Sequence, residues 1–170
     1  MATKASFTPD EWKSVLQSPL LVGIAVSAAD PSGLIGMLKE SMASARALVL
    51  AKADPNADEL VKAVAADFET SEGRGFAHDG LKALLAGSKP ADIAAKTVEA
   101  LRALSALLDA KAPTDAAAFK TWLSHVAGAV AEASAEGGFL GFGGTQVSEA
   151  EKTSVAQIAA ALGVPAPAAT

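Results

Sequence analysis

Helix-start signals recur along the chain, and they constrain its fold more than any other feature. Residues 8–11 (TPDE) combine a capping box with proline at the first helical position, so we expect a helix to begin at Pro9. Ser148 and Glu151 form a second capping box, which predicts a helix that runs to Gly163. Similar signals stand at Asp30-Pro31, Asp54-Pro55, Ser88-Lys89-Pro90 and Thr114-Asp115.

Apolar residues between these signals repeat with helical spacing, and no stretch alternates apolar and polar residues as a half-buried strand would. Hydrophobic residues make up 51% of the 170 residues and charged residues 19%, which is typical of one globular domain with a real core. We therefore predict an all-α fold, a single-domain bundle of about seven helices over residues 1–163. Residues 164–170 (VPAPAAT) are predicted to be a disordered C-terminal tail.

Three places are harder to interpret. Ser18-Pro19 either kinks the first helix or starts a second one, and the apolar run at residues 19–29 is predicted to be a buried core helix. That run is shorter than the roughly 20 residues that span a bilayer. Asp54-Pro55 is expected to open the next helix. Residues 70–75 (TSEGRG) are expected to interrupt it until the pattern resumes at Phe76.

Charge and cysteine content exclude several classes of function. The net charge is −5 and no cluster of lysine and arginine stands out, so nucleic acid is not an expected partner. The chain has no cysteine, which removes disulfides, thiolate nucleophiles and iron–sulfur ligation. The first twelve residues lack the apolar core of a secretory signal. We expect a cytoplasmic protein.

No complete catalytic set is apparent. The two histidines are His78 and His125, and Ser124 adjoins His125 at an angle of about 100° on a helix, which is a poor geometry for proton transfer. No glutamate is followed by a histidine three residues later, as a di-iron carboxylate bundle requires. Both histidines are expected at the surface or at its boundary with the core. The sequence leans away from an enzyme without deciding the question.

Residues 136–152 (EGGFLGFGGTQVSEAEK) form the most unusual segment. The glycine spacing approaches that of a P-loop, but Gly144 stands where the lysine should be, so a phosphate site is not expected. Phe139, Leu140 and Phe142 either plug the core or form an exposed loop for a protein partner. No basic residue flanks them, which makes membrane contact unfavourable.

Four carboxylates bracket this loop, and they favour a cation over an anion there. They belong to Glu132, Glu136, Glu149 and Glu151. A divalent cation is the one cofactor that the sequence leaves open.

The C-terminal segment resembles the tellurite-resistance TerB-like helical family. An acidic glycine turn at Glu136-Gly137 is followed by Ser148 to Glu151 and by the aliphatic helix end at residues 158–163. Residues 20–33 (LLVGIAVSAADPSG) are similar to the family's first helix and turn. The resemblance implies a metal site at Asp30, Glu136 and Glu149, and a role in stress-response complexes near membranes.

The sequence departs from that family by inserting FLGFGGT and by placing proline after Asp30. Our leading hypothesis is a non-enzymatic, soluble helical module that acts through protein contacts. Its contacts are either with a protein partner or with a second copy of the chain, and it has an acidic metal site in addition. The alternative is a metal-dependent enzyme or metal sensor that uses the carboxylates around residues 132–151.

Overall fold

The computed structural model describes residues 1–28, 44, 46–135 and 147–167. In this part of the chain the regular structure is helical and no residue lies in a strand. The elements are the 3-10 helix η1 (Lys4–Ser6), α1 (Pro9–Ser27), a helical segment at residues 46–53, α3 (Glu59–Glu69), α4 (Ser71–Leu85), α5 (Pro90–Lys111), α6 (Ala116–Ala135) and α7 (Glu149–Leu162). The prediction of an all-α bundle of about seven helices is confirmed.

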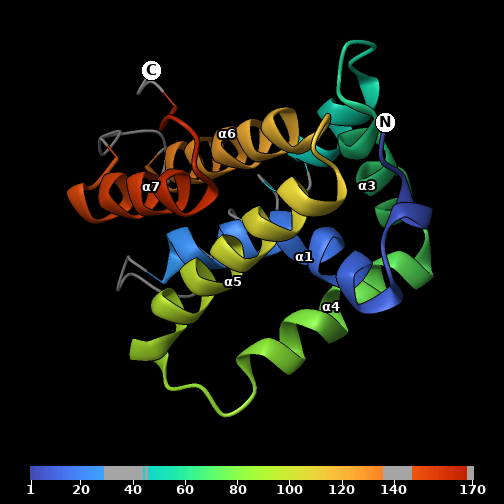
Figure 1. Ribbon diagram of the computed structural model, residues 1–170. Coiled ribbons are helices and arrows are strands. Elements are labelled where there is room, and N and C mark those ends of the chain that lie inside the picture. The colour runs from blue at the N-terminus through green and yellow to red at the C-terminus, as the bar shows by residue number, and fades with distance from the viewer. Residues whose placement is uncertain (29–43, 45, 136–146, 168–170) are drawn as a thin grey trace.

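Helix α1 is the centre of the bundle. It contacts α3, α4, α5, α6 and α7, and Figure 1 shows it between α4 and α5 on one side and α6 and α7 on the other. Its second half buries residues on every side, including Leu21, Val22, Ala25 and Val26. A helix that is apolar all round needs neighbours all round. The prediction of a buried core helix after Pro19 is confirmed for the described residues.

Pro19 lies inside α1, which continues without a break. A proline at this position cannot donate a hydrogen bond to the carbonyl four residues earlier, at Val15. The Ser18 hydroxyl donates to that carbonyl oxygen instead, over 2.7 Å, and both side chains are fully buried. Ser18 therefore satisfies the acceptor that Pro19 frees, and this allows one helix where the sequence left two readings open.

Two predicted helix boundaries are wrong. Asp58, and not Asp54, caps α3, because its carboxylate accepts the Leu60 N–H over 2.9 Å. The interruption predicted at residues 70–75 is confined to Thr70, where α3 ends, and α4 begins at Ser71 rather than at Phe76. Thr70 caps α4 by accepting the Gly73 N–H over 2.8 Å.

Helix α7 begins with the predicted capping box of Ser148 and Glu151 and ends at Gly163, which has a left-handed φ of 71°. Buried serines attach it to its neighbours. Ser154 donates to the Ala25 carbonyl at the end of α1 over 2.9 Å, and Ser105 of α5 donates to the Leu162 carbonyl over 3.0 Å.

The start of the predicted tail contacts the bundle within the described range 164–167. Val164 packs against the core, and Ser124 of α6 donates to the Pro165 carbonyl over 3.3 Å. The domain boundary at residue 163, and disorder of residues 168–170, stay predictions.

Candidate functional site

An open groove of about 1250 Å³ lies between α6 and the chain from residue 46 to the first turn of α3. One wall is formed by Arg46, Leu50, Ala51, Asp54, Asp58 and Val61. The other wall is one face of α6, with Ala118, Thr121, Trp122, His125, Ala129 and Glu132. Segment 46–53 lies near the start of α6 at the upper right of Figure 1.

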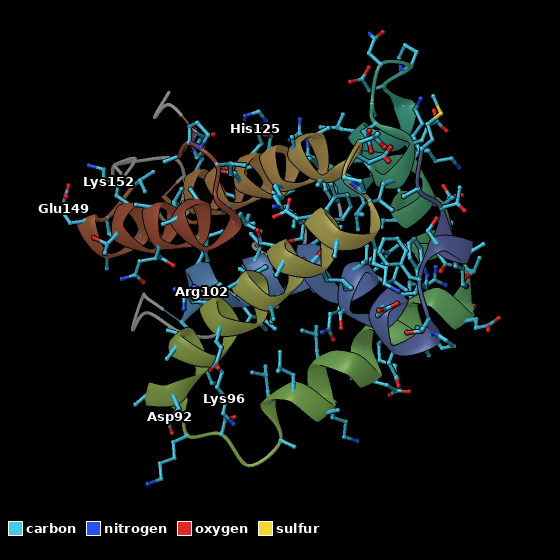
Figure 2. The ribbon with its side chains drawn as sticks, in the orientation of Figure 1. Asp92, Lys96, Arg102, His125, Glu149 and Lys152 are labelled. Carbon is cyan, nitrogen blue, oxygen red and sulfur yellow. The ribbon has the colours of Figure 1, made fainter. Side chains whose placement is uncertain are left out.

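The two faces of α6 explain its wall. Phe119, Leu123 and Val130 are fully buried and hold the helix against the bundle. The opposite face carries small residues and a half-buried Trp122, whose ring lies 5.4 Å from that of Phe119. His125 is exposed, and it points away from the bundle in Figure 2. Alanine on this face keeps the helix but leaves the space in front of it unfilled.

The wall at residues 46–58 exposes aliphatic side chains. Leu48 is buried, whereas Val49 and Leu50 are 68% and 58% exposed, and Leu50 lines the groove. Burying a leucine side chain is worth about 1.5–3 kcal/mol, so an exposed leucine beside a groove favours an occupant. Asp54 accepts the Asn56 N–H over 2.8 Å and makes the turn at the end of this segment.

A pair of carboxyl groups lies beside the groove where the two walls meet. Burial is the largest effect on Asp58 and raises its pKa, and the neighbouring Asp115 carboxylate raises it further, against the Leu60 N–H. Burial alone would raise the pKa of Asp115 as well. Hydrogen bonds from the Thr114 hydroxyl, over 2.8 Å, and the Ala2 N–H, over 2.9 Å, lower that pKa below its usual value.

The Met1 ammonium group lies 3.8 Å from Asp115 and lowers its pKa in the same direction. Asp115 is thus the more acidic member of the pair, and Asp58 is the carboxyl group that takes up a proton first as the pH falls. The pair joins the N-terminal segment, α3 and the start of α6 at one end of the groove.

Replacing Asp58 by asparagine should stabilise the protein at about pH 7. Because the pKa of Asp58 is raised above 3.8, its protonated form stabilises the fold below that value, and this stability is lost as the pH rises through the folded-state pKa. Asparagine keeps the cap on the Leu60 N–H and cannot ionise. Urea unfolding of parent and variant should therefore give a difference in stability that shrinks between about pH 7 and about pH 4.

Asp115 acts in the opposite direction, since a lowered pKa stabilises the fold above 3.8 and this stability is lost as the pH falls through the folded-state value. The control is Asp79→Asn on α4, which removes a solvent-exposed carboxylate and should leave the stability at about pH 7 nearly unchanged. A parent more stable than Asp58→Asn at about pH 7 would contradict this assignment.

Most of the site residues predicted from the sequence lie outside the described residues. They are Asp30 and Glu136 of the metal site, and Phe139, Leu140 and Phe142 of the interaction loop. Glu149 is described, and it lies at the start of α7 with its side chain 89% exposed and paired with Lys152 over 2.7 Å. Figure 2 shows both residues at the N-terminal end of α7. The metal site and the interaction loop stay predictions.

Carboxylates and histidines of the described residues are dispersed. No three His, Asp or Glu side chains there lie close enough together to hold a metal ion. Glu151 is buried and its carboxylate accepts the Ser148 N–H over 2.8 Å, so it belongs to the cap of α7. His78 and His125 are exposed, as expected.

None of the helices in the described ranges is long and apolar enough to cross a membrane. No family model matches the chain, and no curated protein or solved structure matches it either.

Proposed function

We propose that this chain is a helical module that binds a helical segment of another protein in the groove between α6 and residues 46–58. The groove itself, with the exposed Leu50 on one wall and the alanine face of α6 on the other, carries this proposal. An amphipathic helix buries its apolar face in such a groove through residues spaced i, i+3, i+4 and i+7.

The dimensions of the groove favour a peptide over a small molecule. Its volume of about 1250 Å³ exceeds the roughly 300–1,000 Å³ of pockets that enclose small ligands. The α6 residues that line it extend from Ala117 to Ala133, which is about 24 Å at a rise of about 1.5 Å per residue. A partner helix of about four turns matches that length.

The small side chains of the α6 wall support close packing of a third helix. Ala118 and Ala129 are exposed and line the groove. Helix axes pack 8–10 Å apart depending on the side chains at the contact, and alanine permits the shorter separations. Trp122 supplies the large, half-buried aromatic surface that is common in the energetic centre of protein interfaces.

Trp122 also reports on occupancy of the groove. Trp12 is 1% exposed in the core and donates to Asp67 over 2.7 Å, so a ligand in the groove should leave its emission unchanged. A tryptophan-free peptide of about 16 residues, with a leucine face and glutamine on its polar face, should shift the emission of Trp122 with a Kd on the order of 10 µM. Trp122→Phe should abolish the signal.

Ala129→Phe should fill the groove and weaken binding of this peptide at least about tenfold, which fluorescence anisotropy of the labelled peptide measures. The matched control is Ala106→Phe, which adds the same ring to an exposed position of α5 outside the groove. Equal binding by both variants would refute the groove as the binding site, because the two proteins differ only in where the ring is placed.

A further inference from the structure

Acidic residues outnumber basic residues among the described residues that line the groove. Among these described residues, three carry carboxylates, Asp54, Asp58 and Glu132, and one, Arg46, carries a guanidinium group. The whole chain carries a net charge of −5, so the long-range field has the same sign as the groove. The apolar lining explains why a helix would bind there. The charges add a preference for one kind of helix.

Two of these carboxylates are held in place before any partner arrives. Asp54 accepts the Asn56 N–H over 2.8 Å, and Asp58 accepts the Leu60 N–H over 2.9 Å. Each is therefore a charge on a fixed turn, and no side-chain entropy is lost when a partner's cation approaches.

We propose that the partner segment is a cationic amphipathic helix of another protein, with leucine-like residues on the face that enters the groove and lysine or arginine along its edges. This inference rests on the proposed function, and it adds the chemistry of the partner. Basic side chains meet the acidic edge of the groove, and an acidic helix is repelled by it. Acidic groove edges also disfavour an anionic membrane surface as the occupant.

Three peptides of about 16 residues test this, each with the same leucine face and with lysine, glutamine or glutamate at the polar positions. Anisotropy titration at an ionic strength of about 0.1 M should give the lysine peptide an affinity about tenfold above that of the glutamine peptide, and the glutamate peptide the weakest. The preference should shrink at about 1 M salt, where charges are screened within about 3 Å.

Asp54→Asn/Asp58→Asn is the informative variant, because asparagine keeps both backbone hydrogen bonds and removes both charges. It should weaken the lysine peptide about fivefold and leave the glutamine peptide unchanged. The matched control is Asp10→Asn/Asp79→Asn, which removes two exposed carboxylates outside the groove and should change neither affinity.

The possible results separate the two proposals. Equal affinity for the lysine and glutamate peptides would overturn the charge preference while the groove stands. Binding of no peptide would overturn both proposals. Sedimentation velocity of the free protein tests whether the groove binds a second copy of this chain. Self-association that Ala129→Phe abolishes would assign the groove to that second copy and overturn the cationic partner.

Discussion

Gly73→Ala is expected to destabilise the protein by about 3 kcal/mol, although alanine is the better helix former by about 1 kcal/mol. A Cβ atom on Gly73 would overlap the carbonyl oxygen of Asp67, which is a backbone atom and cannot rotate away. That oxygen already accepts hydrogen bonds from the Thr70 N–H, over 3.0 Å, and from the Thr70 hydroxyl, over 2.7 Å. The junction of α3 and α4 must therefore open to admit one methyl group.

Gly75→Ala is the matched control for this prediction. Gly75 lies two residues along the same helix, and a Cβ atom there meets nothing within 4 Å. Alanine at this position should stabilise the protein by about 0.5–1 kcal/mol through helix propensity alone. Urea unfolding followed by circular dichroism at 222 nm measures both changes. Stabilisation by both substitutions would show that the α3–α4 junction differs from the one described.

Ser18→Ala is expected to cost about 2 kcal/mol, because it leaves the Val15 carbonyl buried without a hydrogen bond. The loss arises only because position 19 is proline and has no N–H to donate. In a Pro19→Ala background the backbone N–H should bond Val15 again, so the same serine substitution should then cost less than about 0.5 kcal/mol.

The two costs form a double-mutant cycle that urea unfolding can measure. Ser14→Ala is the control, since the Ser14 hydroxyl also donates to a carbonyl of α1, that of Asp10, but at an exposed position. It should cost little in either background. If Ser18→Ala cost the same with and without Pro19, the hydroxyl would not be the substitute for the missing N–H.

Local signals predicted the helix ends that depend only on neighbouring residues. The two capping boxes, Thr8 with Glu11 and Ser148 with Glu151, start α1 and α7, and Gly163 ends α7. In the two capping boxes the hydrogen bonds that stabilise the helix start link residues three positions apart, so the sequence pattern contains the whole interaction. This is why these boundaries could be predicted.

The boundaries that were wrong depend on competition between neighbouring signals. Asp54 and Asp58 are both good caps, and the structure uses Asp54 for a turn to Asn56 and Asp58 for the helix. Glycines 73 and 75 suggested a break, but Gly73 is required where α4 passes close to the end of α3, and a helix continues through it. A contact between two helices is not visible in the composition of either.

The groove could not be predicted for a similar reason. Its walls come from residues 46–61 and 117–133, which are distant in sequence, and the alanines of α6 read as ordinary helix formers. The one signal available in the sequence was Val49-Leu50. These two exposed aliphatic residues belong to the same helical segment as Leu48, which is buried. The sequence directed attention to the acidic and phenylalanine-containing loop instead, and that loop lies outside the described residues.

The most direct test of the central claim is amide chemical-shift mapping of the 15N-labelled protein during titration with the lysine peptide. We predict that the chemical-shift changes concentrate in residues 46–61 and 117–133, and that the amide chemical shifts of α4 do not change. Shift changes centred on α4 and α5, with those two stretches unaffected, would contradict a binding groove between α6 and residues 46–58.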